Sequence, residues 1–242
     1  AFPDDKRAAA LIKAAGKSAP KGLDAKALSA ALQQAWRDFH SGDFKAAFEA
    51  GEKLGPVGAS VAVKALGIHA TYLVDDEAEQ EARYQRGAAI AETAVKALPD
   101  EANSHYRHAF ALGRYSQKLS IAKALKMGLA GKVRQSLDNA LELDAKHAEA
   151  HTALALYHAE IIGKIGALIG GMTYGAKAAE AEKHIKTALK LTPDSPIAHV
   201  EHGNMVLLLQ GDKGEDAAAG AFEKAAKLKP RDAMEALDAR YA

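Results

Sequence analysis

The chain of 242 residues contains no cysteine, which excludes disulfides, thiolate nucleophiles and cysteine-ligated metal sites. It has no excess of either charge, because 32 Lys and Arg residues are balanced by 31 Asp and Glu residues. Aromatic residues make up only 6% of the chain and are not interleaved with basic clusters, so the sequence shows no basic patch of the kind that binds nucleic acid. No apolar run reaches the roughly 20 residues that a membrane-spanning helix needs. We therefore predict neither a nucleic-acid partner nor a transmembrane span.

What the sequence does contain is a repeated junction between helices. Hydrophobic residues make up 48% and charged residues 26% of the chain, which is typical of a folded domain. Four segments each indicate the end of one helix, a turn with Pro or Asp, and the start of the next helix. These segments are "AVKALPDEANSH" (94–105), "ALELDAKHAEAH" (140–151), "ALKLTPDSPIAH" (188–199) and "AAKLKPRDA" (225–233).

The junctions resemble those of the tetratricopeptide repeat (TPR), and so do "SGDFKAAFEAGEKL" (41–54) and "GNMVLLLQGD" (203–212). The resemblance implies an all-α fold, a right-handed TPR-like α-solenoid of about four to five helix pairs with small residues at close helix contacts. We expect an N-terminal helix and linker over 1–24, the repeats over 25–233 and a capping helix over 234–242. The larger side chains expected to fill the spaces between helices are Phe44, Phe48, Ile185, Leu189 and Phe222.

The spacing of the junctions predicts two enlarged helix pairs. Pro99, Ala145, Pro193 and Pro230 occupy equivalent positions, and the gaps between them are 46, 48 and 37 residues. A standard repeat has about 34 residues. The extra residues fall between the first and second helices of two consecutive pairs, in 115–133 and in 161–177. The second insertion includes "IIGKIGALIGGMTYG", which is apolar nearly all round. Insertions of neighbouring repeats meet on one face of a solenoid, which is often the binding face.

We interpret the two insertions as the walls of a pocket for a long apolar ligand, such as a lipid or sterol. Tyr106 and His108 would add polar groups that orient the ligand. Two alternatives stay open: the insertions pack as extra core, or they form a surface for a partner protein. The predicted ligand-binding residues are Leu112, Tyr115, Leu119, Ile121, Leu125, Met127, Leu129, Tyr157, His158, Ile161, Ile162, Ile165, Leu168, Ile169, Met172 and Tyr174.

The ten histidines follow the repeat register rather than a catalytic pattern. His105, His151 and His199 each follow their junction residue by six positions, which indicates a repeated structural role. His147 and His151 have the i,i+4 spacing of two metal ligands, but the sequence offers no evident third ligand. Glu160, beside the apolar insertion, is either an ordinary surface carboxylate or a buried group that binds a ligand hydroxyl. With no phosphate-binding loop and no nucleophile elbow, we expect no enzyme activity, no metal and no cofactor.

Within the superfamily, the enlarged repeats resemble those of bacterial periplasmic proteins that serve transport systems, notably the TPR subunit of tripartite periplasmic transporters. A looser similarity is to the microtubule-dynamics regulator family, whose helical repeats are also lengthened. The first resemblance implies a carrier or transporter-associated protein, with a hydrophobic small molecule and a transport-system protein as partners. The alternative is a scaffold that binds a peptide or partner subunit in its concave groove. The start at Ala1 fits a mature periplasmic form, with or without membrane association, and equally a trimmed chain.

Overall fold

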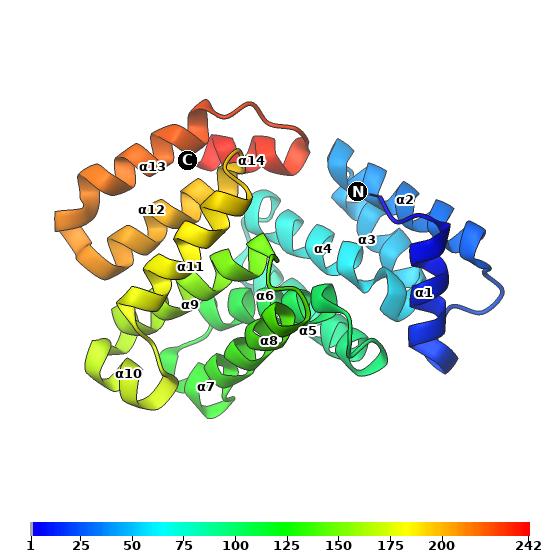
Figure 1. The fold of residues 1–242 in the computed structure, drawn as a ribbon, viewed down its shortest axis with the longest axis horizontal. Coiled ribbons are helices and arrows are strands. Elements are labelled where there is room, and N and C mark those ends of the chain that lie inside the picture. The colour runs from blue at the N-terminus through cyan, green and yellow to red at the C-terminus, as the bar shows by residue number, and fades with distance from the viewer. Residues whose placement is uncertain (1) are drawn as a thin grey trace. The chain divides into compact units, whose positions relative to one another are not determined.

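The computed structural model describes residues 2–242, and in that range it consists of helices and contains no strand (Figure 1). The chain divides into two compact units, Ala1–Leu143 and Asp144–Ala242. The first unit contains α1 (Asp5–Ala15), α2 (Ala25–Ser41), α3 (Phe44–Lys53), α4 (Ala59–Leu73), α5 (Glu77–Ala97), α6 (Ala102–Gln117), α7 (Ile121–Lys126) and α8 (Leu129–Leu143). The second contains α9 (Ala148–Ile165), α10 (Ala167–Tyr174), α11 (Ala178–Leu191), α12 (Pro196–Gln210), α13 (Glu215–Lys227) and α14 (Ala233–Tyr241). Short 3-10 turns are η1 (Gly16–Ser18), η2 (Gly55–Gly58) and η3 (Gly211–Gly214).

Antiparallel helix pairs are the building block of both units. In the first unit, α2 packs on α3, α4 on α5, and α6 on α8, while successive pairs meet through α3 with α4 and α5 with α6. In the second unit, α9 packs on α11 and α12 on α13, with α12 also against α9 and α14 against α12 and α13. The short helices α7 and α10 lie where the sequence predicts the two insertions. The prediction of an all-α, TPR-like fold with two enlarged hairpins is therefore confirmed.

Aspartates define where several helices begin. The side chains of Asp24, Asp43 and Asp76 accept hydrogen bonds from the backbone N–H three residues ahead, at 2.8, 3.0 and 2.7 Å. Such a cap satisfies one of the amide groups that the first turn of a helix leaves without an intrahelical partner. Each cap fixes the start of a helix next to a short turn, which is what a tightly connected hairpin requires.

Close helix approach depends on glycine at two positions, one between neighbouring pairs and one within a pair. A Cβ atom on Gly67 of α4 would lie 2.3 Å from Phe110 Cε1 of α6. A Cβ atom on Gly203 of α12 would lie 2.6 Å from Phe222 Cε1 of α13. Both distances are far shorter than van der Waals contact, so the aromatic ring occupies the space that any other residue would need. Gly203 belongs to one of the TPR-like segments of the sequence.

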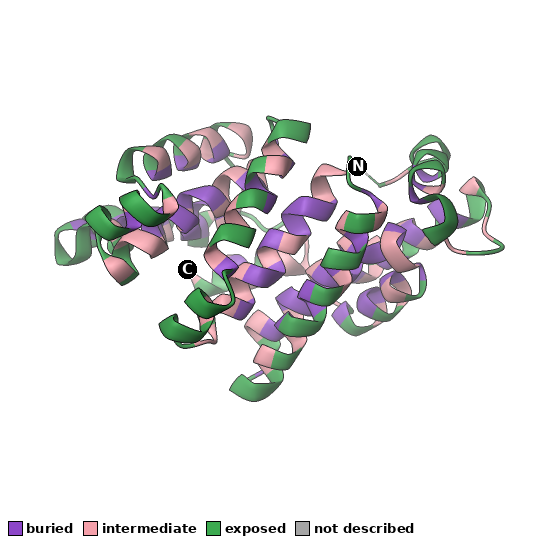
Figure 2. Ribbon diagram, turned by 90° about the horizontal axis from the view of Figure 1, so that it is seen from below, coloured by how far each residue is buried: buried purple, intermediate pink, exposed green. Residues whose placement is uncertain are grey.

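The cores are rich in alanine, and most helices bury one face while exposing the other (Figure 2). Around Tyr84 and Tyr115, the first unit packs Ala88, Ala91 and Ala111. The second unit packs alanines of α9, α11 and α13 against Ile185 and Met205. The predicted space-filling residues are confirmed in this role, since Phe44, Phe48 and Ile185 are buried, and Leu189 and Phe222 pack partly buried against the core. Within residues 2–242, no helix has both the length and the apolar content that crossing a bilayer demands.

Candidate functional site

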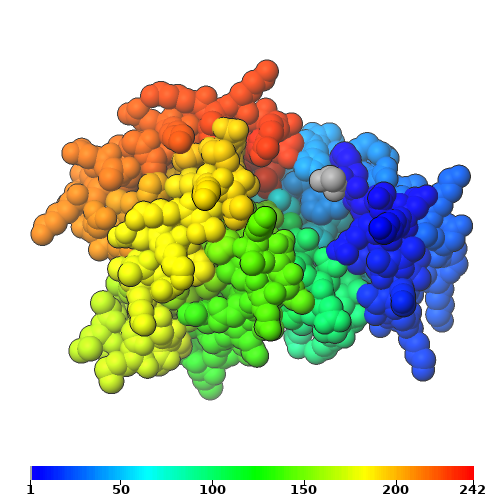
Figure 3. Space-filling view, in the orientation of Figure 1, coloured from blue at the N-terminus to red at the C-terminus, as the bar shows by residue number. Residues whose placement is uncertain are grey.

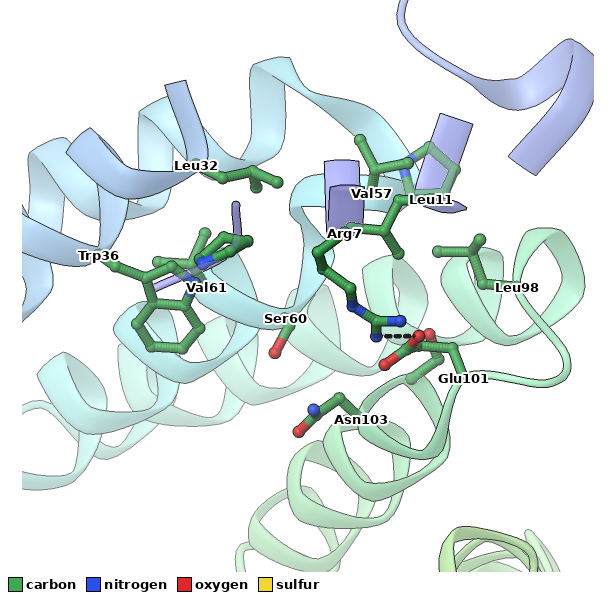
Figure 4. Close-up of a pocket in the computed structure, with 13 residues that line it drawn as sticks. Arg7, Leu11, Leu32, Trp36, Val57, Ser60, Val61, Leu98, Glu101 and Asn103 are labelled. Atoms are coloured by element: carbon green, nitrogen blue, oxygen red, sulfur yellow. Dashed lines mark hydrogen bonds and ion pairs between the residues drawn. The ribbon is translucent and has the colours of Figure 1, made fainter. Parts of the chain in front are cut away.

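A cavity of about 210 Å³ lies in the first unit, between the N-terminal segment, the middle of α2 and the starts of α4 and α6 (Figure 4). Its apolar wall comes from Leu11 of α1, Leu32 and Trp36 of α2, and Val61 of α4. Its polar wall comes from Arg7, Ser60, Glu101, Asn103 and Ser104. The elements that meet here are the first helices of successive pairs, α2, α4 and α6, together with α1.

The apolar wall follows from helical spacing on α2. Leu28, Leu32 and Trp36 recur every four residues, so they share one face of this helix. Leu28 and Leu32 are buried, and Trp36 is half-buried. The Trp36 ring meets the Phe39 ring edge-on at 5.6 Å and stacks on the His40 ring at 5.8 Å between centroids. These ring contacts fix the orientation of the indole at the rim of the cavity.

The N-terminal segment is held against this face by three kinds of contact. The amide of Gln33 donates to the backbone carbonyl of Pro3, with Nε2 and O 2.9 Å apart. Along α1, Ala8, Leu11 and Ala15 recur at i, i+3 and i+7 and are buried against α2 and η2. The guanidinium of Arg7 forms an ion pair with the carboxylate of Glu101 (Figure 4). Backbone hydrogen bonding, apolar insertion and an ion pair are the same contacts by which a groove holds a peptide.

A buried cation lies behind the polar side of the cavity, in contact with the lining residue Ser60. Arg107 of α6 is nearly inaccessible, its Nε lies 3.4 Å from the hydroxyl oxygen of Ser60, and its guanidinium carbon lies 4.8 Å from the Tyr106 ring centroid. A cation in a poorly solvated position creates a stronger field than one at the surface. The cavity therefore combines an aromatic wall, hydroxyl and amide groups, and charges of both signs. It is smaller than the pockets of about 300–1,000 Å³ that hold drug-sized ligands, and its volume suits one or two side chains.

The residues predicted as the first ligand wall divide into two groups. Leu112, Tyr115 and Leu129 are buried in the core of the first unit, and Leu119 packs partly buried against the same cluster. Ile121, Leu125 and Met127, on α7 and its end, are exposed.

The second predicted wall divides in the same way. Tyr157 and His158 are buried, and Ile161, Ile162, Ile165 and Tyr174 are half-buried. Leu168, Ile169 and Met172 of α10 are among the most exposed apolar side chains. The ligand-binding role of these residues stays a prediction.

The repeated structural role predicted for His105, His151 and His199, here called the junction histidines, is confirmed. Their Nε2 atoms lie 2.6, 3.1 and 2.8 Å from the carbonyl oxygens of Pro99, Ala145 and Pro193. Because a carbonyl only accepts hydrogen bonds, each Nε2 carries the proton and donates. Each junction histidine thus ties the start of a first helix to the turn that precedes it.

The junction histidine His151 also belongs to a cluster of three imidazoles. Its Nδ1 lies 2.8 Å from His184 Nδ1, and the rings of His184 and His158 stack at 6.2 Å. Since His151 donates through Nε2, its Nδ1 accepts and His184 Nδ1 donates. Burial, together with His151 and His158, lowers the pKa of His184 to about 4. His184 is therefore neutral near pH 7.

His147 and Glu160, for which the sequence allows either a ligand-binding or a structural role, both have partners within the protein. His147 begins α9, and its Nδ1 accepts from the backbone N–H of Ala150 at 3.2 Å. Glu160 forms an ion pair with Lys164 at 3.1 Å and is largely shielded from solvent. Among residues 2–242, no group of three His, Asp or Glu side chains is placed to hold a metal ion.

The cavity of the first unit is not predicted from the sequence, which indicates only a helix and linker over residues 1–24. Ala8, Leu11 and Ala15 do have the periodicity of an amphipathic helix. That periodicity shows a buried face, but it does not reveal which surface covers it. The contacts of Arg7 with Glu101 and of Pro3 with Gln33 join residues that are 94 and 30 positions apart in the sequence. Local sequence patterns cannot predict contacts over such separations.

Comparisons with known proteins agree with the repeat architecture. The family described as "Regulator of microtubule dynamics protein 1-3" matches residues 62–164, which is less than half of the chain. The crystal structure of TTC0263, a thermophilic TPR protein in Thermus thermophilus, is 17% identical and has a TM-score of 0.60. That likeness covers 88% of this chain and 95% of the other, and it shows a TPR-like fold. The crystal structure of MamA protein, also 17% identical, covers 88% of this chain and 94% of its own, with a TM-score of 0.41. No curated protein matches the sequence.

Proposed function

We propose that this protein is a non-enzymatic interaction scaffold, and that the cavity of the first unit receives side chains of a protein partner. The observation that carries the proposal is the seating of the N-terminal segment. The same surface already holds a stretch of polypeptide through a backbone carbonyl, a row of small and apolar side chains, and an ion pair. A TPR-like fold, which exposes the first helices of successive repeats side by side, suits such a partner.

The chemistry of the cavity defines the partner segment. An aliphatic or aromatic side chain would enter between Leu11, Trp36 and Val61, where burial of apolar area supplies most of the affinity. Its neighbours in the partner would hydrogen-bond with Ser60 and Asn103. The mixed charges of Arg7 and Glu101 disfavour a strongly acidic or strongly basic segment. A peptide with one apolar anchor flanked by neutral polar residues therefore fits best.

A peptide library displayed on phage, panned against the purified protein, tests this proposal. Trp36 is the single tryptophan of the chain, so its emission reports directly on occupation of the cavity. Selected peptides should change the emission and share an apolar anchor. In fluorescence anisotropy with labelled peptides, Trp36→Ala and Asn103→Leu should each weaken binding by roughly tenfold. The matched control, Tyr241→Ala, truncates an exposed aromatic residue of the second unit and should leave the affinity unchanged.

Two results would refute the scaffold site. If panning enriches no sequence above the unselected library, the cavity is not a peptide-binding surface. Selected peptides whose affinity is indifferent to both Trp36→Ala and Asn103→Leu would place binding elsewhere. Circular dichroism of each variant distinguishes a lost contact from a lost fold.

An apolar-ligand carrier is the second candidate function. It is favoured by the exposed apolar residues of the two enlarged hairpins, Ile121 and Leu125 in one and Leu168 and Met172 in the other. Native mass spectrometry of the purified protein, followed by organic extraction, tests it. A co-purifying lipid that is lost in Leu168→Asp would support a carrier, and a clean mass with no binding from a lipid panel would contradict it. The periplasmic location and the transport-system partner expected from the resemblance belong to this candidate.

A further inference from the structure

Helix α10 is uncharged and mostly apolar, and it lies at the surface of the second unit. Its sequence, ALIGGMTY, contains no charged residue, and Gly170 is its only buried position. Leu168 is 76% exposed, Ile169 58% and Met172 82%. In the space-filling view, the yellow-green atoms of this part of the chain stand at the lower left margin (Figure 3). An apolar helix that buries so little of itself is not explained by the packing of its own unit.

Further exposed apolar side chains lie in the same unit, where α12 meets the end of α9 that leads into α10. Leu207 and Leu208, near the end of α12, are also exposed. A Cβ atom on Gly163 of α9 would lie 3.4 Å from Leu208 Cδ2, so the ends of α9 and α12 are in contact. We call Leu168, Ile169, Met172, Leu207 and Leu208 the apolar tip. It gathers residues from α10 and α12, which are far apart in sequence, in one unit.

The position of α10 is fixed by the contact of Gly170 with α9 and by its C-terminal end. At its C-terminus, Gly175 adopts a left-handed conformation, with N–H bonds from Gly175 and Ala176 back to Gly171 and Gly170. Beyond it, the backbone N–H of Lys177 donates to Nδ1 of the buried His158 at 3.3 Å. These contacts hold the apolar side chains outward.

Basic residues flank the apolar tip on both sides of α10. Between residues 161 and 179, the only charged residues are Lys164 and Lys177, and neither Asp nor Glu occurs there. Lys164 is paired with Glu160, so part of its charge is balanced, and its side chain is 42% exposed. Lysine at the ends of an apolar segment keeps its ammonium in the polar headgroup layer while its stem covers apolar surface.

We propose that the apolar tip inserts into the surface of a bilayer that contains anionic lipids. The side of α10 opposite the buried Gly170 presents Leu168, Ile169 and Met172 together, and the helix has no charged residue. A bilayer surface takes up apolar side chains of this kind at the boundary between headgroups and acyl chains, while flanking basic groups stay in the headgroup layer. Lys164 and Lys177 would meet the anionic headgroups. With eight residues, α10 is far too short to cross the membrane, so insertion is shallow and reversible.

Because the chain has no cysteine, a single introduced thiol reports insertion at one site. An environment-sensitive dye is attached to Met172→Cys in α10, and to Leu143→Cys, another exposed apolar position, as the matched control. Both proteins are mixed with vesicles of phosphatidylcholine alone or with about 30% phosphatidylglycerol, which supplies the anionic surface. The dye on Met172→Cys should brighten and shift to shorter wavelength with the anionic vesicles, less with the neutral ones, and the control dye should not respond.

Loss of the apolar side chains completes the test in unlabelled protein. Leu168→Ser with Met172→Ser should reduce flotation with anionic vesicles by at least about tenfold. The control pair, Leu73→Ser with Leu143→Ser, removes two exposed leucines of the first unit and should float like the wild type. The proposal is overturned if the dye on Met172→Cys does not respond to anionic vesicles, or responds equally to neutral ones. It is also overturned if the dye responds without vesicles as protein concentration rises, because the tip then covers a second copy of the chain.

Discussion

The two enlarged hairpins carry insertions at equivalent places, and both expose apolar side chains, but they are held to their units by different contacts. In the first unit, the insertion is tied to α5 by ion pairs from Lys118 to Glu77 at 3.7 Å and from Lys123 to Glu81 at 3.4 Å. In the second unit, α10 has no charged residue with which to make such a tie. The first insertion is therefore held along its own unit, and the second presents its side chains outward.

The two insertions also differ in the residue that each contributes to the core. Leu129, the first residue of α8 and part of the first insertion, is 2% exposed and packs in the cluster around Tyr84 and Tyr115. In the second hairpin, Gly170 is the buried residue of α10, and it lies against Ile161. The two insertions differ little in length, so length does not explain why the first contributes a large side chain to the core and the second only a glycine. Four changes test this comparison, and they follow from the largest expected effect to the smallest.

Truncating the core residue of the first hairpin should cost the most. Leu129→Ala leaves a cavity among aromatic and aliphatic neighbours, and we expect the free energy of unfolding to fall by about 2–4 kcal/mol. Urea denaturation followed by circular dichroism measures the loss. Leu168→Ala, the same substitution on α10, should change stability by less than about 0.5 kcal/mol. Equal losses for the two variants would show that both insertions are core.

Acidification should weaken the second hairpin through His184. Its pKa is lowered to about 4 in the folded protein, mainly by burial and then by His151 and His158, while the nearby Glu180 acts in the opposite direction. Between pH 6.5 and about 4 the unfolded chain binds a proton that the folded chain does not, so stability falls as the pH falls through this window. We expect a loss on the order of 1–2 kcal/mol at this site.

The first hairpin supplies the control for this pH dependence. Ser136 of α8 occupies the position equivalent to His184, nine residues before the junction residue, and it pairs with His108 at 2.8 Å. Burial also lowers the pKa of His108, so a background dependence on pH remains. Denaturation at about pH 7 and about pH 4.5, on either side of most of this titration, should show a smaller difference in His184→Ser than in the wild type. An unchanged difference would assign the acid sensitivity to other groups.

Glycine substitutions should have opposite signs in the two hairpins. A Cβ atom on Gly170 would lie 2.9 Å from Ile161 Cγ2, so Gly170→Ala forces α10 away from α9 and should cost about 1 kcal/mol. A Cβ atom on Gly113, inside α6, meets nothing within 4 Å. Gly113→Ala should therefore stabilise by roughly 0.5–1 kcal/mol, because alanine loses less backbone entropy in a helix. Thermal melts of the two variants should move in opposite directions.

The smallest effect concerns the ion pair that ties α7 to α5. Lys123 and Glu81 are partly exposed, so their pair should contribute less than about 0.5 kcal/mol. A double-mutant cycle with Lys123→Ala and Glu81→Ala isolates the coupling energy. The coupling should shrink further in about 0.5 M salt, because exposed charges are screened. A coupling above about 1 kcal/mol would mean that this tie, rather than Leu129, holds the first insertion in place.

Much of the fold is predictable from the sequence, because the repeat is a local pattern. The junctions around Pro99, Ala145 and Pro193 mark where one helix pair ends, and the gaps between them locate α7 and α10 correctly. The junction histidines are also predictable, since their partners lie six residues away in sequence. Patterns of this kind need only helical periodicity and the geometry of a short turn.

The candidate site is not predictable in the same way. Its cavity depends on the packing of α1 against α2 and on the ion pair between Arg7 and Glu101. Both are tertiary contacts, which no spacing of residues in the sequence predicts. The exposure of α10 is hidden for a related reason. An apolar sequence such as ALIGGMTY predicts burial, because burial is the usual outcome for apolar residues. Only the surrounding packing shows that Leu168 and Met172 remain at the surface.

The junction histidines have a consequence for how such a chain changes length. Each lies at the start of a first helix, at the opposite end from the tip of its hairpin, and it fixes the turn by a bond to a residue six positions away. Growth or shrinkage at a hairpin tip therefore leaves the connection between repeats untouched. The segments at the hairpin tips can therefore be replaced, in evolution or by design, without changing how successive helix pairs stack, because the junction histidines hold the turns between the pairs.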